Sequence, residues 1–247
     1  MEDDPISVDR LTRDWTLAQR VKGHRHSTDD LLTGWYAAEN APTAQRLLDL
    51  GAGIGGVGLL ALWRAPAGAT LVAIEAQEIS FSLLVRNIEA NNLTSRVHPV
   101  FGDLRDVRRP DRFDLVTGSP PYWDVTEGVL PADSQKQHAR FELRGDIRDY
   151  ARSARAHLAP GGRFVFCFPT VQRARAEAAV FAADLALVRS KDVIPRAGAA
   201  PLFTLFCCRL ADEDGAPAII DPPHVVRDDT GTPTAAHAAA RATFGLV

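Results

Sequence analysis

The chain has 247 residues, with 28 Lys or Arg against 31 Asp or Glu, so its formal net charge is −3. With 46% hydrophobic and 24% charged residues it has the composition of a globular protein, and a globally basic coat for nucleic acid is excluded, although a local basic patch is not. The three cysteines show no CxxC or Cys/His spacing, so we expect neither a disulfide framework nor a metal site. The acidic N-terminus and the lack of any apolar run near about 20 residues predict a cytoplasmic protein without a membrane segment.

Short apolar runs alternate with helical patterns along the chain. This order predicts an α/β fold with a seven-stranded, mostly parallel sheet and helices on both faces. Only residues 195–201 separate the last two strands, so we expect them to pair antiparallel at one edge of the sheet. The expected strands are 46–50, 70–74, 96–101, 113–117, 163–168, 187–194 and 202–210, and the expected helices are 30–39, 55–64, 78–91, 146–158, 171–184 and 234–244.

A glycine-rich segment joins the first of these strands to its helix. Asp49-Leu50-Gly51-Ala52-Gly53 would let the backbone approach a ligand closely at a helix N-terminus. Glu75 ends the next strand, where a carboxylate can accept both hydroxyls of a ribose, and Asp103 follows the third. A plain strand-to-helix turn and an NAD-binding domain are the alternative interpretations.

The fourth strand ends in Ser119-Pro120-Pro121-Tyr122-Trp123. Two consecutive prolines stop the strand and leave carbonyl oxygens without competing amides. An ordinary Pro-Pro turn is one interpretation. The other is a site in which the Ser119 hydroxyl and the Pro120 carbonyl accept hydrogens from a planar amine while Tyr122 and Trp123 stack on its ring.

These two motifs together resemble class I S-adenosylmethionine-dependent methyltransferases, and the second resembles the [Asn/Asp/Ser]-Pro-Pro-[Tyr/Phe] motif of the amino methyltransferases among them. The resemblance implies a Rossmann-like fold with S-adenosylmethionine as cofactor. It places Asp49, Gly51, Gly53 and Ser119 around the cofactor, Glu75 on its ribose and Asp103 on its adenine amine. Ser119 stands where Asn is more usual and is familiar from cytosine-N4 enzymes, which leaves the target base open.

The segment Gln19–Leu32 resembles the corresponding segment of the tRNA1(Val) adenine-N6 methyltransferase family, and Ala139-Arg140-Phe141-Glu142 resembles its Ala-Arg-His-Glu segment. By this resemblance Thr28 and Asp29 border the methionine end of the cofactor. We therefore expect residues 1–45 to form an N-terminal appendage and lid, 46–210 the catalytic domain, and 211–247 a C-terminal tail.

Arginines recur every fourth residue near the predicted site. For Arg140 and Arg144, phosphate contacts with tRNA and a solvated surface are both open interpretations, whereas Arg152 and Arg155 are expected on a solvated helix face. A second arginine cluster, at residues 105–112, is expected to be a solvated loop.

The sequence therefore predicts methyl transfer to an exocyclic amine of a nucleobase, with adenine N6 in tRNA as the first hypothesis. Cytosine N4, guanine N2, a protein glutamine amide and a small molecule are alternatives within the same fold. A weakly catalytic RNA-interaction module that binds the cofactor is an alternative of another class.

Overall fold

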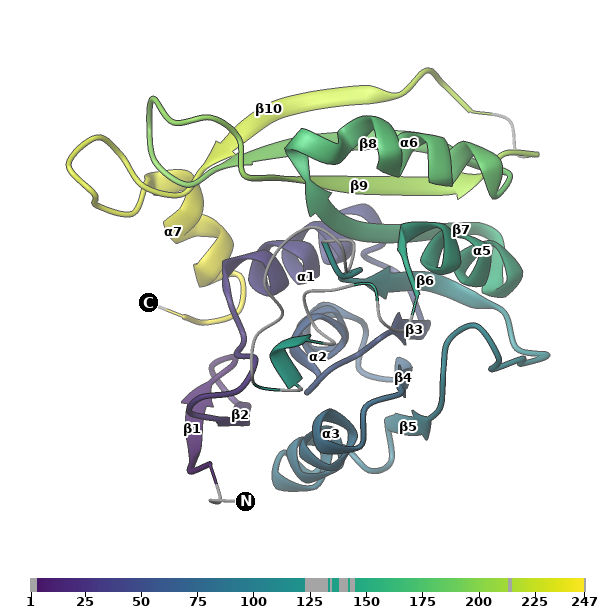
Figure 1. The fold of residues 1–247 in the computed structure, drawn as a ribbon, viewed down its shortest axis with the longest axis vertical. Helices are drawn as coiled ribbons and strands as arrows, with labels where there is room; N and C mark the ends of the chain where they lie inside the picture. The colour runs from purple at the N-terminus through teal and green to yellow at the C-terminus, as the bar shows by residue number, and fades with distance from the viewer. Residues whose placement is uncertain are drawn as a thin grey trace.

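The computed structural model describes residues 4–122, 133, 135–137, 142, 145–212 and 215–246. These residues form a large twisted sheet with helices on both faces, and a separate two-stranded hairpin near the N-terminus (Figure 1). In chain order the elements are β1 (Ile6–Arg10), β2 (Thr16–Arg20), α1 (Thr28–Asn40), β3 (Arg46–Leu50), α2 (Gly56–Arg64), β4 (Thr70–Glu75), α3 (Glu78–Ala90), β5 (Val97–Phe101), β6 (Phe113–Gly118), α5 (Ile147–His157), β7 (Leu158–Pro169), the 3-10 helix η1 (Thr170–Gln172), α6 (Arg173–Ala182), β8 (Leu185–Ile194), β9 (Phe203–Leu210), β10 (Ile219–Val225) and α7 (Ala235–Ala242).

The main sheet has the order β10-β8-β9-β7-β6-β3-β4-β5 in the described part of the chain. It has eight strands where seven were predicted, because β10 pairs in parallel with β8 and extends the sheet. The last two predicted strands, β8 and β9, pair antiparallel near one edge of the sheet, as predicted. β9 also pairs antiparallel with β7, and β10 rather than either of them forms the edge. From β3 to β9 the strands and helices alternate as predicted, whereas the hairpin β1–β2 was not predicted.

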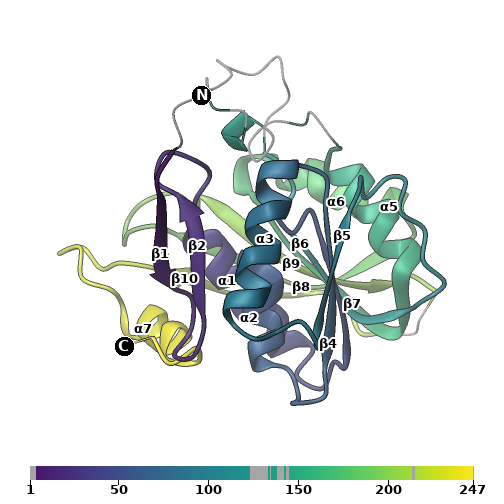
Figure 2. The ribbon, with the colours of Figure 1, turned by 90° about the horizontal axis from the view of Figure 1, so that it is seen from below.

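Each face of the sheet has its own hydrophobic core. Side chains alternate along a strand, so Leu47 belongs to the core beneath α1, α2 and α3, whereas Leu48 belongs to the core beneath α5 and α6. Figure 2 shows α2 and α3 on one side of the sheet and α5 and α6 on the other. All five strand residues of β3 except Arg46 are buried, which is typical of a parallel strand covered on both faces.

The N-terminal hairpin is tied to α3 by asparagine side chains rather than by the main sheet. Asn87 Oδ1 accepts the backbone N–H of Ala18 at 2.7 Å, and Asn91 Oδ1 accepts that of Thr16 at 2.8 Å. The residues that follow the hairpin approach the start of α2, where His26 and Asp30 lie beside Gly56.

Candidate active site

Three glycines between β3 and α2 have left-handed backbone conformations. Their φ angles are +62° at Gly51, +57° at Gly53 and +101° at Gly55. A Cβ atom on Gly51 would lie 2.1 Å from the hydroxyl oxygen of Tyr150, whereas a Cβ atom on Gly53 would meet no atom within 4 Å. Gly51 is thus needed for the close approach of α5, and Gly53 leaves open space close to the N-terminus of α2, which favours negative charge.

Asp49 lies buried behind this loop. Its two carboxylate oxygens accept hydrogen bonds from the hydroxyl of Thr117 at 2.7 Å and from the backbone N–H of Gly58 at 3.0 Å. Burial raises the pKa of Asp49 to about 7, although both hydrogen bonds act to lower it. The side chain therefore ties β6 and α2 to β3, and its predicted contact with the cofactor stays a prediction.

Glu75 stands at the carboxyl end of β4, as predicted. Its oxygens accept the backbone N–H of Gly53 at 2.8 Å and that of Gln77 at 2.6 Å. The residue is 9% exposed. The hydrogen bond from Gly53 fixes the carboxylate against the glycine loop, so that two predicted site residues are coupled directly.

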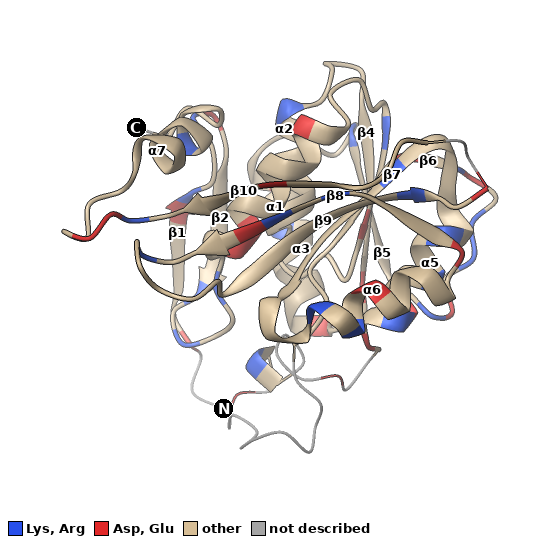
Figure 3. Ribbon diagram, turned by 90° about the horizontal axis from the view of Figure 1, so that it is seen from above, with Lys and Arg blue, Asp and Glu red and all other residues tan. Residues whose placement is uncertain are grey.

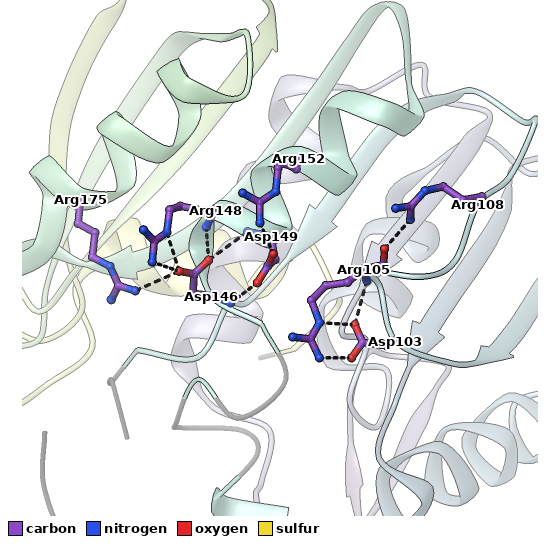
Figure 4. A network of polar contacts seen from close by, with 8 residues as sticks. All are labelled: Asp103, Arg105, Arg108, Asp146, Arg148, Asp149, Arg152 and Arg175. Carbon is purple, nitrogen blue, oxygen red and sulfur yellow. Dashed lines mark hydrogen bonds and ion pairs between the residues drawn. The ribbon is translucent and has the colours of Figure 1, made fainter. Parts of the chain in front are cut away.

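Asp103, which follows β5, pairs with Arg105. Both oxygens take part, with Arg105 Nε at 2.9 Å and one terminal nitrogen at 2.7 Å (Figure 4). Two arginines of α5 also form ion pairs, Arg148 with Asp146 and Arg152 with Asp149. Figure 3 shows basic and acidic residues interspersed along α5 and α6, which agrees with the interpretation of Arg152 and Arg155 as part of a solvated helix face.

The segment after β6 turns its polar groups toward Cys167 of β7. Ser119 Oγ lies 3.4 Å from the sulfur of Cys167, and so does the hydroxyl oxygen of Tyr122. The Tyr122 hydroxyl also donates to Asp29 Oδ2 at 3.0 Å. The ring of Tyr122 meets Phe168 edge-on, with the ring centroids 6.0 Å apart, so packing and hydrogen bonds together fix this side chain.

The start of α1 forms another wall. Asp30 caps the helix by accepting the backbone N–H of Ser27 at 3.1 Å, and His26 Nδ1 lies 3.4 Å from the same carboxylate. Asp29 lines the cavity described below, whereas Thr28 does not, and contact of Asp29 with the methionine end of the cofactor stays a prediction.

These walls enclose one cavity of about 710 Å³. Of the residues predicted for the site, Trp123, Arg140 and Arg144 lie outside the described residues. The cavity lining brings together ten of the other eleven from four strand ends and from the start of α1: Asp29, Asp49, Gly51, Gly53, Glu75, Asp103, Ser119, Pro120, Pro121 and Tyr122.

Tyr150, Gln135 and Gln77 are among the lining residues that were not predicted. Tyr150 reaches the cavity from α5, and only the packing of that helix against the glycine loop places it there. Gln135 is 1% exposed, accepts the backbone N–H of His24 at 3.2 Å and donates to Ser80 at 3.1 Å. The position of Gln77 in the lining could have been predicted from the sequence, because it follows Glu75, a predicted site residue, by two residues.

The residues present fit S-adenosylmethionine. The cavity volume is within the range of small-molecule sites, roughly 300–1,000 Å³. A cradle stays open at Gly53, which a Cβ atom would fill, and carboxylates suited to hydroxyl and amine donors stand at the ends of β4 and β5.

No group of three or more His, Cys, Asp or Glu that could hold a metal ion occurs in the described part of the chain. Within the same residues no helix is both long and apolar enough to cross a bilayer.

Comparison with known proteins identifies the family. The methyltransferase small domain family matches residues 31–181, more than half of the chain. A relative from Bacteroides thetaiotaomicron named tRNA1(Val) (adenine(37)-N6)-methyltransferase is 28% identical over 174 residues, which span 70% of this chain and 72% of the relative. A relative of the same name from Glaesserella parasuis is 27% identical over 143 residues, and the chain spans only 58% of its length.

The fold is also that of a solved methyltransferase structure. A predicted O-methyltransferase from Agrobacterium tumefaciens superimposes with a TM-score of 0.66 at 19% identity, over 89% of this chain and 98% of that one. At this identity the likeness concerns the fold. The chain therefore belongs to the methyltransferase small domain family and is an S-adenosylmethionine-dependent methyltransferase.

Proposed function

We propose that the chain methylates an exocyclic amine of a nucleobase, with adenine N6 in tRNA as the substrate. The observation that carries this proposal is that Ser119, Pro120, Pro121 and Tyr122 line the same cavity as the glycine loop. The names of the relatives support the choice of adenine and tRNA.

The chemistry follows from the electronic structure of such an amine. Its lone pair is delocalised into the ring, which makes the nitrogen a poor nucleophile. When the Ser119 hydroxyl and the Pro120 carbonyl accept its two hydrogens, a more tetrahedral nitrogen is favoured and its lone pair is freed for attack.

S-adenosylmethionine supplies an electrophilic methyl group on a sulfonium. The amine proton becomes strongly acidic only after methylation, so the residues of this chain need not include a strong base. Their contribution is orientation and hydrogen-bond acceptance.

Methylation of bulk tRNA tests the proposal. The full chain is incubated with tRNA and S-adenosylmethionine labelled on the methyl group, and the digested nucleosides are analysed by mass spectrometry. We expect the label in N6-methyladenosine. Label in N4-methylcytidine or N2-methylguanosine would change the target base, label in protein glutamine would replace RNA as the substrate, and no label in any acceptor would contradict catalysis.

Two substitutions test the role of the fourth-strand motif. Ser119→Ala should lower kcat about 100-fold, because one acceptor at the amine is lost, and isothermal titration separates this loss from any change in the affinity for S-adenosylmethionine. Tyr122→Ala should also lower the rate. The exposed Ser95 provides the matched control, since Ser95→Ala removes a hydroxyl that does not line the cavity. Full activity in both site variants would remove the motif from the mechanism.

A further inference from the structure

A chain of polar contacts runs from Asp29 to Ser119 through two intermediate side chains. Tyr122 donates to Asp29 at 3.0 Å, and the sulfur of Cys167 lies 3.4 Å from both the Tyr122 hydroxyl oxygen and the Ser119 hydroxyl oxygen. The second oxygen of Asp29 accepts the hydroxyl of Ser27. Four residues from α1, the segment after β6 and strand β7 thus form one continuous relay, Asp29–Tyr122–Cys167–Ser119.

The direction of this relay is set at its Asp29 end. A carboxylate accepts hydrogen bonds and has no proton to donate, so the proton of Tyr122 must point to Asp29. The tyrosine oxygen is then available only as an acceptor, and a hydroxyl that already donates to a carboxylate is a stronger acceptor for the next donor. The S–H of Cys167 supplies that donor.

Cys167 can carry this role because it is a protonated thiol. The residue is free, lies in β7 with 0% exposure, and burial raises its pKa to about 12. With its proton directed to Tyr122, the sulfur is left as an acceptor on its other side. The hydroxyl of Ser119 can then donate to the sulfur, which would leave its lone pairs for the cavity that Ser119 lines.

We propose that Asp29 and Cys167 are positioning residues that hold the Ser119 hydroxyl so that it presents only acceptor lone pairs to the cavity. The use of those lone pairs on an amine rests on the proposed function. The relay gives the Ser119 hydroxyl proton a fixed partner, which an asparagine in this motif would not need. An asparagine carbonyl can only accept, whereas a hydroxyl can rotate and point its own proton at the amine, so serine needs a fixed partner for that proton.

Infrared spectroscopy tests the direction of the relay without reference to activity. The S–H stretching band of Cys167 is identified by its loss in Cys167→Ala. We expect Tyr122→Phe to shift this band to higher frequency, because the thiol loses its acceptor, and Ser119→Ala to shift it by much less, because the thiol then loses only the polarisation by the Ser119 hydroxyl. A band that shifts more in Ser119→Ala than in Tyr122→Phe, or that moves in neither variant, would overturn the proposal.

Kinetics test whether the relay acts through Ser119. Cys167→Ala should lower kcat about tenfold with an unchanged KM for S-adenosylmethionine, and should cause no further loss when Ser119 is already alanine. Cys167→Ser, which keeps a donor and an acceptor, should retain most of the activity. Cys207 is the matched control, a free thiol with 0% exposure in the same hydrophobic core that is not a member of the relay.

An equal fractional loss from Cys167→Ala in both backgrounds would indicate a merely structural role and would overturn the proposal. The two proposals fail separately. If the wild-type chain methylates no nucleobase amine, the proposed function is wrong, while the infrared bands still decide the direction of the relay.

Discussion

Replacing Gly53 by alanine separates the folding of the glycine loop from its use in binding. Gly53 lines the cavity at a φ of +57°, and an added Cβ atom would meet no protein atom within 4 Å. The only cost to folding is therefore the left-handed backbone, roughly 1–2 kcal/mol for a residue with a side chain. For a chain of this length that corresponds to a fall in Tm of about 2–8 °C.

Binding should suffer more than folding. The added methyl group occupies space that the protein itself leaves open at the cavity wall, so a cofactor that passes over Gly53 must be displaced. We expect the Kd for S-adenosylmethionine, measured by isothermal titration, to rise at least about tenfold, which corresponds to roughly 1.4 kcal/mol.

Gly198 provides a matched control, because its φ is +79°, a Cβ atom there also meets nothing within 4 Å, and it does not line the cavity. Gly198→Ala should lower Tm by a similar amount and leave Kd unchanged. If Gly53→Ala binds the cofactor as tightly as the wild type, the cofactor does not pass over this glycine and the reasoning fails.

Three further predictions concern stability. Burial raises the pKa of Asp49 from its ordinary value of 3.8 to about 7, so between these pH values the folded state holds a proton that the unfolded state has released. The free energy of unfolding should therefore fall as pH rises from about 4 to about 7, and urea titrations should show a smaller slope in Asp49→Asn. His224 has the opposite effect, because burial lowers its pKa from 6.5 to about 4, so the free energy of unfolding that it contributes is lost as pH falls from about 6.5 to about 4. His224→Gln should reduce this loss of stability at low pH, and the fluorescence of Trp35, whose ring centroid lies 5.5 Å from that of His224, reports the local change. Gly58→Ala should lower the free energy of unfolding by about 1–3 kcal/mol despite the better helix propensity of alanine, because the added Cβ atom would lie 2.7 Å from the Asp49 carboxylate. An unchanged midpoint of chemical denaturation would show that this carboxylate can move.

The residues that end the parallel strands could be predicted from the sequence as one site. Glu75 ends β4, Asp103 follows β5, and Ser119 follows β6, each after a short β-prone run. Parallel strands bring their carboxyl ends to the same edge of a sheet, so local order along the chain becomes proximity in space. The strands and helices themselves were also predictable, because buried strands and amphipathic helices each show a characteristic spacing of hydrophobic residues.

Other elements depend on partners that the local sequence does not show. β10 contains Pro222 and Pro223, which argue against a central strand, and it pairs only because β8 offers a free edge where proline is tolerated. The hairpin β1–β2 is largely exposed on its first strand and is held by asparagine side chains of α3 that are about 70 residues away in sequence.

The sequence alone therefore determined the layered α/β architecture and which residues stand at the strand ends, because both follow from short-range patterns and from the geometry of parallel sheets. Only the tertiary structure decided that Tyr150 closes on Gly51 and that Cys167 joins Tyr122 to Ser119. These contacts connect residues 45 or more positions apart, and their distances depend on how α5 and β7 pack against the loops, which no local pattern encodes.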